Sequence, residues 1–269
     1  MRAREVALYL EQVCAHRLYE VGCDSVPTNL DRLATSLGAR IQYEQLHDEG
    51  SVERDSEGYL IRIKSDSPEV RKRFSIAHEI GHLIIAKLLC EKDSEDYKRF
   101  RRFAHVAEGL NEETLANQIA GILLLPAWFV QSRVGDAYSV STVVKLAKEA
   151  NVSISTALIR IVHLSTAPCV AFMARRAGAG PVRLMWHWTS QSIDSASAKS
   201  DLADEYVLQT LIQGGYARDE SLALNWLGCD CLYRNFDNVT TWHGLARVEV
   251  SNRLSMTKKQ TSGELAVHP

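Results

Sequence analysis

The chain has 269 residues, of which 46% are hydrophobic and 24% are charged, and its formal net charge is −2. This composition is typical of a folded globular protein with two or three structural units. It excludes an intrinsically disordered chain and any general basic attraction to nucleic acid. The longest apolar stretch, residues 120–130, is interrupted by Pro126 and is too short to span a bilayer. Because the N-terminus also lacks the apolar run of a signal peptide, we expect a cytoplasmic protein with no membrane contact.

The N-terminal part of the chain alternates between helical and extended patterns. Apolar spacing predicts a helix over residues 5–21 and a second, short helix that Asn29 caps. Residues 39–46 alternate as a strand, and residues 51–64 read as a hairpin that turns at 56–58. An edge strand beside a binding site can hold an extended peptide by main-chain hydrogen bonds, but a strand that only covers a helix fits the pattern equally well.

The next segment, Arg71 to Leu88, is an apolar helix that carries the motif HEIGH, with His78, Glu79 and His82. Residues four apart on a helix differ by only about 40° in direction, so both imidazoles leave one face and can share a metal ion. Glu79 lies roughly 60° off that line, where its carboxylate could reach a water on the metal more easily than the metal itself. The plain alternative is a buried helix whose histidines are hydrogen-bonded core residues. The stretch 91–109 that follows is dense in both charges and is typical of a solvated connection.

A second buried helix is predicted from Leu110 to Pro126, with Asn111 as its cap. A carboxylate at its start is the type of third ligand that two histidines need to form a metal site with an open position. We favour Glu113 over Glu112, because Glu112 would face about 100° away. Asn117 shares the face of Glu113 and could hydrogen-bond a histidine ring.

The two motifs together resemble the ImmA/IrrE family of bacterial metallopeptidases. In that family an aromatic residue and AHE-x-GH are followed, roughly thirty residues on, by E-x-x-A-N and A-x-x-L-L-x-P. This chain reads FSIAHEIGHLI and EETLANQIAGILLLP at the corresponding places. It departs at Ile119, where an aromatic is common, and at Leu125, where methionine is common. Both are expected to be core positions, so the chemistry is not affected.

The resemblance implies a zincin-like metallopeptidase domain over residues 1–135. It implies Zn²⁺, or a similar divalent metal such as Mn²⁺, bound by His78, His82 and Glu113, with Glu79 as the catalytic proton acceptor. His105, Tyr97 and Tyr59 are open candidates for stabilising the oxyanion. The implied substrate is a helix-turn-helix transcriptional repressor, whose cleavage would derepress stress-response or mobile-element genes.

Residues 136–166 have the pattern of a helix-turn-helix, with its two helices between Ser139 and Leu164. Such a unit can read DNA through its second helix. That helix offers few polar side chains for the purpose, namely Ser155, Thr156, Arg160 and His163. We therefore favour structural packing or substrate docking over sequence-specific DNA binding, as the resemblance also does.

Residues 167–257 are predicted to form a separate α+β domain, which makes the whole chain an α+β protein, and residues 258–269 a disordered tail. The expected elements are strands at 169–175 and 182–189, a loop at 191–200, a helix at 201–212, and strands at 223–232, 240–242 and 245–250. By layout the domain is similar to the GAF-like sensor of the radiation-response branch of the family. Four tryptophans in it could line a pocket for a small-molecule effector, although core packing is the favoured interpretation: Trp186, Trp188, Trp226 and Trp242.

Three functions therefore remain open: a site-specific protease, a DNA-binding regulator with a non-catalytic metal site, and a ligand-sensing regulator. The six cysteines lack the spacing of a disulfide framework, so free thiols in a reducing compartment are expected. Cys229 and Cys231 are one residue apart without a second pair, which makes a metal role for them the less favoured interpretation.

Overall fold

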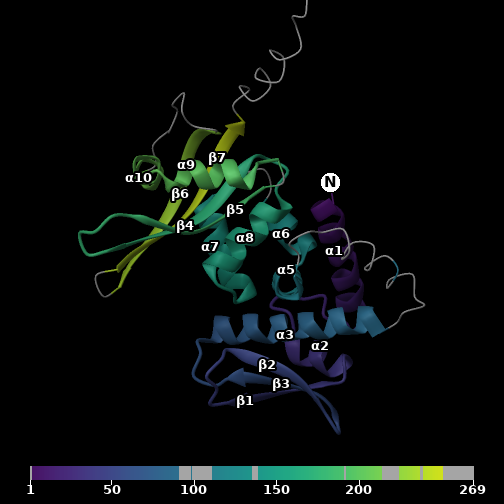
Figure 1. Ribbon diagram of the computed structural model, residues 1–269. Coiled ribbons are helices and arrows are strands. Elements are labelled where there is room, and N and C mark those ends of the chain that lie inside the picture. Colours follow the sequence, from purple (N-terminus) through teal and green to yellow (C-terminus); the bar gives the residue numbers. More distant parts are fainter. Residues whose placement is uncertain are drawn as a thin grey trace, which may run out of the picture. The chain divides into compact units, whose positions relative to one another are not determined.

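The structure is a computed structural model that describes residues 2–90, 98, 111–134, 139–190, 192–213, 224–236 and 239–250. The chain forms two compact units, Met1–Ile161 and Val162–Pro269. Both contain helices and a sheet (Figure 1), so the α+β class predicted from the sequence is confirmed. The predicted charged connection at 91–109 and the tail at 258–269 lie outside the described residues, except for Lys98.

Unit 1 contains a three-stranded sheet and a set of helices. Its elements are α1 (Arg2–Glu20), α2 (Leu30–Ser36), β1 (Ala39–Glu44), β2 (Gly50–Asp55), β3 (Gly58–Lys64), α3 (Glu69–Cys90), α5 (Glu112–Leu124), α6 (Ala127–Val134), α7 (Val140–Ala150) and α8 (Ile154–Leu164), the last of which ends in unit 2. The strand order is β1-β3-β2, with β1 parallel and β2 antiparallel to the central β3. The long helix α3 packs across β2 and β3 on one side and against α5 on the other (Figure 1).

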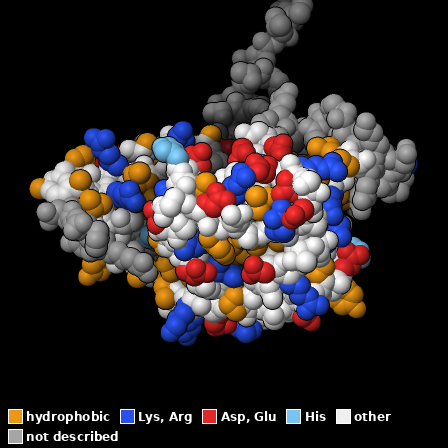
Figure 2. Space-filling view, turned by 90° about the horizontal axis from the view of Figure 1, so that it is seen from below, with side chains coloured by type: hydrophobic (Ala, Val, Ile, Leu, Met, Phe, Trp, Pro, Cys, Tyr) orange, Lys and Arg blue, Asp and Glu red, His pale blue; other side chains and the backbone are white. Residues whose placement is uncertain are grey.

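The two faces of this sheet differ as the alternation in β3 predicts. Ile61 and Ile63 are fully buried, whereas Arg62 between them forms ion pairs with Glu44 of β1 and Glu53 of β2. Figure 2 shows acidic and basic side chains interspersed on the surface seen from the sheet side of unit 1. One face of the sheet is thus a core surface under α3, and the other is a solvated surface of mixed charge.

Capping residues fix where three of the helices begin. The side chains of Asn29, Asn111 and Ser139 each accept a hydrogen bond from the backbone N–H three residues further on, at the starts of α2, α5 and α7. The left-handed conformation of Asn151 (φ 52°) ends α7, and α8 follows after a short turn. The predicted caps at Asn29 and Asn111 and the predicted helix pair between residues 139 and 164 are therefore confirmed.

The backbones of α3 and α5 touch at Gly81. A Cβ atom on Gly81 would lie 2.9 Å from the carbonyl oxygen of Ala116 and 3.0 Å from its Cα. Only glycine leaves room for this approach. It brings the HEIGH face of α3 directly against the first turns of α5.

Unit 2 is built on a four-stranded antiparallel sheet. Its elements are β4 (Cys169–Ala177), β5 (Arg183–Thr189), α9 (Ser195–Ala203), α10 (Glu205–Ile212), β6 (Leu224–Phe236) and β7 (Val239–Val250). The order β5-β4-β7-β6 places β4 and β7 in the centre. The core lies between one face of this sheet and the two helices, and it includes Phe172, Trp242, Leu202 and Leu208.

Three sequence predictions in unit 2 are wrong. Residues 191–200 do not form a loop throughout, because Asp194 caps α9 and Ala198 is buried in the core. The predicted helix at 201–212 is broken at Asp204, whose extended backbone ends α9 and whose side chain caps α10. The predicted strands at 240–242 and 245–250 are one continuous strand, because Gly244 does not interrupt β7 but makes room for the ring of Phe172.

The tryptophans of unit 2 whose side chains are described lie on both faces of the sheet. Trp186 and Trp188 pair with Met173 and Ala171, whereas Trp242 pairs with Ala174 on the opposite face, where it joins the core. These three side chains therefore do not line one common pocket.

None of the described helices is long and apolar enough on its own to cross a membrane. The helices α5 and α6 reach that length and apolar composition only when they are taken together, and they are bent by 59° where they meet.

We expect Gly81→Ala to destabilise the fold by about 1–3 kcal/mol, because the added methyl group must force the backbones of α3 and α5 apart. Gly121→Ala is the matched control on α5, since a Cβ there would meet nothing within 4 Å. That change should be neutral or stabilising by up to about 1 kcal/mol, through helix propensity alone. Urea unfolding of both variants measures the difference. An unchanged midpoint for Gly81→Ala would mean that the two helices can separate at no cost.

Candidate metal centre

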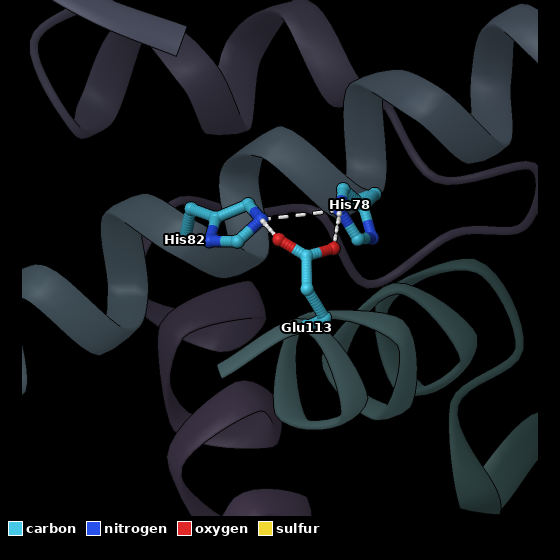
Figure 3. A group of neighbouring side chains, drawn as sticks. All are labelled: His78, His82 and Glu113. Atoms are coloured by element: carbon cyan, nitrogen blue, oxygen red, sulfur yellow. Dashed lines mark hydrogen bonds and ion pairs between the residues drawn. The ribbon is translucent and has the colours of Figure 1, made fainter. Parts of the chain in front are cut away.

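Two imidazoles from α3 and one carboxylate from α5 converge on a common point (Figure 3). The Nε2 atoms of His78 and His82 lie 3.1 Å apart. The carboxylate of Glu113 reaches both, with Oε2 3.3 Å from Nε2 of His78 and Oε1 3.4 Å from Nε2 of His82. The ligand atoms of the three residues all lie within 4.8 Å of one another, so the group could hold a metal ion.

This donor set fits a divalent metal such as zinc. Two nitrogens and one carboxylate oxygen are the three protein ligands of many catalytic zinc sites. Atoms bonded to one zinc ion at tetrahedral angles are separated by roughly 3.3–3.5 Å, given bond lengths of about 2.0–2.2 Å. The three distances of 3.1, 3.3 and 3.4 Å are close to this spacing. The side chains therefore need only small shifts to bind one ion.

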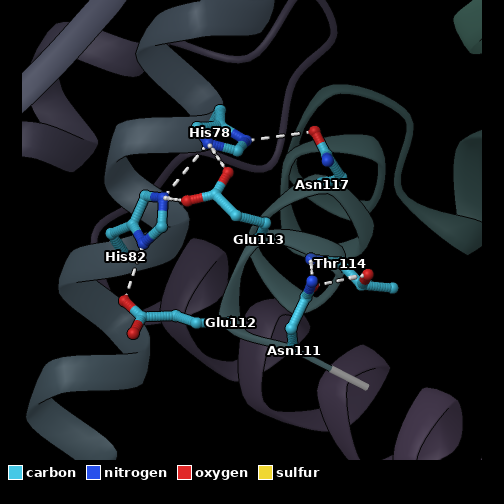
Figure 4. A network of polar contacts seen from close by, with 7 residues as sticks. All are labelled: His78, His82, Asn111, Glu112, Glu113, Thr114 and Asn117. Carbon is cyan, nitrogen blue, oxygen red and sulfur yellow. Dashed lines mark hydrogen bonds and ion pairs between the residues drawn. The ribbon is translucent and has the colours of Figure 1, made fainter. Parts of the chain in front are cut away.

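Hydrogen bonds behind the rings orient both histidines (Figure 4). Nδ1 of His78 lies 3.1 Å from Oδ1 of Asn117, and Nδ1 of His82 lies 2.8 Å from Oε1 of Glu112. A carboxylate or carbonyl oxygen can only accept, so Nδ1 carries the proton in each ring. The lone pair of each Nε2 then points to the common centre, as metal binding requires.

The electrostatic surroundings keep His78 in the neutral form that binds metal. Burial lowers the pKa of His78 below its ordinary value, and the neighbouring His82 lowers it further, while Glu113 and Asn117 act in the opposite direction. A neutral imidazole at neutral pH is the form with a free lone pair.

Glu112 has a role that the sequence argument missed. The sequence predicted that Glu112 faces away from Glu113. In the structure its carboxylate instead contacts the second histidine, His82, which lies one turn along α3 from His78. The helices run antiparallel here, because Glu112 contacts His82 while Asn117, further along α5, contacts His78. The signal in the sequence that could have indicated this contact is the pair of acidic residues in the first turn of α5. Two histidines one turn apart can each contact a different carboxylate. The expected contact of Asn117 with a histidine ring is confirmed.

Glu79 is a buried carboxylate beside the centre. Only 7% of the residue is exposed, and a Cβ atom on Gly50, at the start of β2, would lie 3.2 Å from its Oε1. Burial raises the pKa of Glu79 above its ordinary value; the charge of His82 opposes this and that of Glu113 adds to it. A carboxylate with a raised pKa is suited to accept and release a proton.

Of the three candidates for oxyanion stabilisation, His105 and Tyr97 lie outside the described residues. Tyr59 is at the start of β3, with the guanidinium of Arg54 over its ring. It is four residues, or about 13 Å along the strand, from Ile63, which is the residue paired with Gly50 near Glu79. The position of Tyr59 therefore does not favour a role at the centre.

Two histidines one turn apart, a glutamate on a second helix and a buried glutamate between them define a metallopeptidase-like centre. Residues 34–162, which include all four residues, match the family model of the IrrE N-terminal-like domain, Peptidase_M78. This match supports the ImmA/IrrE family and a protease-type, metal-binding domain.

Among solved structures, a Mycobacterium tuberculosis transcriptional regulator has a similar fold, with a TM-score of 0.54 and 15% identity. The alignment covers 92% of this chain and 81% of that one. At this level of identity the likeness concerns the fold alone. A comparison with curated proteins gave no match.

We expect Glu113→Ala and Glu112→Ala to separate a metal ligand from a residue that orients a ligand. Glu112→Ala removes only the hydrogen bond to His82 and should weaken zinc affinity about 10–100-fold. Glu113→Ala removes a donor atom and should weaken it further. Competition with a chromophoric zinc chelator measures both. Equal affinities for Glu113→Ala and wild type would remove Glu113 from the ligand set.

The raised pKa of Glu79 predicts a pH-dependent difference in stability between the metal-free wild type and Glu79→Gln. A carboxyl group whose pKa is higher in the folded state stabilises the fold while protonated, and this contribution is lost as the pH rises through the folded pKa. The free energy of unfolding of the wild type should therefore fall relative to that of the variant as the pH rises from about 4.5, the ordinary pKa of glutamate, through the raised pKa of the folded state. Thermal unfolding in a chelator across this range tests it. A constant difference would contradict the assignment.

Proposed function

We propose that this chain is a metal-dependent endopeptidase that cleaves a helix-turn-helix transcriptional repressor and so derepresses stress-response or mobile-element genes. The observation that carries the proposal is the convergence of His78, His82 and Glu113 beside the buried Glu79. The match of the surrounding residues to a peptidase family model supports it.

The roles of the side chains follow from their positions. His78, His82 and Glu113 would hold the metal, while Glu112 and Asn117 keep the two rings in the required orientation. A divalent metal such as zinc, held by these residues, would supply Lewis-acid chemistry toward a water molecule and a peptide carbonyl. Glu79 takes the proton of the attacking water on its carboxylate and delivers it to the leaving amine.

The edge of the sheet offers a place for the substrate. In the described part of the chain β2 pairs only with β3, and its first residue, Gly50, lies beside Glu79. An extended peptide added to the outer side of β2 would bond to its main chain and pass the catalytic carboxylate. This supports cleavage of an extended, unfolded segment of the repressor.

DNA reading by α8 is the alternative that the helix-turn-helix pattern raises, but the contacts of α8 do not favour it. Arg160 is only 4% exposed, donates to the carbonyl oxygen of Leu125 at 2.8 Å and forms an ion pair with Glu11 of α1. The ring of His163 packs against Trp188, with centroids 4.8 Å apart. Arg160 is thus engaged inside the protein, and the half-buried ring of His163 is engaged with Trp188, so neither favours base contacts in a DNA groove.

A regulatory role for unit 2 is part of the proposal. A sheet covered on one face by two helices is an architecture that can house a small-molecule effector in a sensor domain of the GAF-like type. A compound that raises the melting temperature of the chain without affecting its metal content would identify such an effector.

We expect Glu79→Gln to keep the fold and the metal but to lose proteolysis by several orders of magnitude, because no group remains to accept the proton. Whole-proteome quantification of cells expressing either form, under DNA-damaging stress, measures the effect. A repressor that disappears only with the wild type is the expected result, and the isolated pair of proteins should reproduce the cut.

The same variant distinguishes the alternative. If wild type and Glu79→Gln retard one DNA fragment equally while both proteomes match and added repressor candidates stay intact, the metal centre is not the output of the protein. The DNA-binding reading would then replace the protease reading.

A further inference from the structure

Two cysteines of unit 2 lie close together, far along the chain from the metal centre. Cys229 and Cys231 are two residues apart on β6, so their side chains leave the same face of the strand. Their Sγ atoms are 3.2 Å apart. Both side chains are half-buried and pack against the core, and Sγ of Cys231 is 4.0 Å from the carbonyl oxygen of Leu211 on α10.

The neighbouring strand has no side chain opposite Cys231, where the ring of Phe172 and the sulfur of Cys229 come close to its backbone. Gly244 of β7 is the residue paired with Cys231, and a Cβ atom on it would lie 2.9 Å from Sγ of Cys229. The pairing of β6 with β7 also shifts register immediately before Cys229, between Trp226 and Cys229. The irregularity beside the pair gives the backbone of β6 the freedom that the two thiols need to approach each other.

A metal site is the weaker reading of this pair. A structural zinc ion needs four ligands. Among the described side chains, the histidine, cysteine and acidic residues that gather in a group of three are His78, His82 and Glu113, and the two cysteines are not part of it. The chemistry that two thiols can complete without a further ligand is formation of a disulfide.

We propose that Cys229 and Cys231 form a peroxide-reactive dithiol that closes reversibly to a disulfide within β6. One thiol transfers its sulfur electron pair to hydrogen peroxide. The O–O bond breaks, a sulfenic acid forms and one water leaves. The second sulfur attacks the sulfenic sulfur, the S–O bond breaks, the S–S bond forms and a second water leaves. The net reaction converts two thiols and one peroxide into one disulfide and two waters.

Closure must move the sulfurs together by about 1.2 Å, since an S–S bond is about 2.05 Å long. Because Cys231 lies beside Leu211, this movement acts directly on the contact between β6 and α10. Thiol reductants reverse the reaction by thiol–disulfide exchange. The proposal is independent of the peptidase function, because it concerns residues of unit 2 alone.

The other four cysteines serve as internal controls for the reactivity of the pair. Burial raises the pKa of Cys14 to about 12 and raises the pKa values of Cys23 and Cys169, so their thiolates are scarce. Cys90 is the exposed thiol that could give linked dimers, and Cys90→Ser removes it. The full-length Cys90→Ser chain is therefore the reference protein.

The experiment exposes this reduced protein to a small excess of hydrogen peroxide, alkylates the remaining thiols and digests with trypsin. Cys229 and Cys231 fall in one peptide, Asp219–Arg234. The expected product is that peptide without alkyl groups and two hydrogen atoms lighter, and it should revert with dithiothreitol. The added variants Cys229→Ser and Cys231→Ser should each abolish this product.

A synthetic peptide of the same sequence shows whether the fold is responsible. The folded chain should form the disulfide at least about tenfold faster, because it holds the sulfurs in position. Equal rates would overturn the proposal. So would separate oxidation of the two cysteines to sulfinic acids, or full alkylation of both after peroxide treatment of a chain whose circular dichroism is native.

Discussion

The close contact between α3 and α5 at Gly81 is the constraint on which the candidate centre depends. The two histidines come from one helix and the third candidate ligand, the carboxylate of Glu113, comes from another, so the distance between these side chains is set by how near the two backbones can lie. A side chain at position 81 would collide with the backbone of Ala116. Glu113 and Asn117 are the neighbours of Ala116 one turn before and one residue after it. Both side chains reach the imidazole of His78 because the two helices are in contact at Gly81 and Ala116.

The centre is also arranged at a cost to the fold. Two imidazoles whose Nε2 atoms are 3.1 Å apart, together with a buried glutamate, form a group that the metal-free chain can satisfy only in part. Burial lowers the pKa of His78 and raises that of Glu79, so the surroundings disfavour the charged form of each side chain. Groups perturbed in opposite directions within one turn of a helix are typical of sites shaped for chemistry and not for stability.

The sequence predicted most reliably what depends on local signals. Asn29 and Asn111 were recognised as caps because the preference lies in the residue itself and its distance to the next N–H groups. The hairpin predicted over residues 51–64 is likewise present as the antiparallel pair of β2 and β3. The three candidate ligands could be proposed because helical geometry places His78 and His82 on one face and favours Glu113 over Glu112, a choice that the resemblance then supported.

The failures are cases where a distant partner decides. Nothing next to Gly244 shows that Phe172, seventy residues away, occupies the space above it and lets the strand continue. The serine-rich segment after Gln191 becomes helical because Ala198 finds a core to join. Helical geometry gave the direction of the Cα–Cβ bond of Glu112, which turns away from Glu113. It did not give the position of the second histidine ring, which the side chain of Glu112 reaches in the structure.

The second helix of the helix-turn-helix segment, α8, makes structural contacts within unit 1. The buried guanidinium of Arg160 would be costly without partners, and it finds them in Glu11 and in the carbonyl oxygen of Leu125. Leu125 is the residue that ends α5. The helix that carries Glu113 is thus held at one end by Asn111, which caps it, and at the other by a side chain from α8. Through Arg160, the second helix of the motif is therefore tied to the helix that supplies Glu113 to the candidate centre.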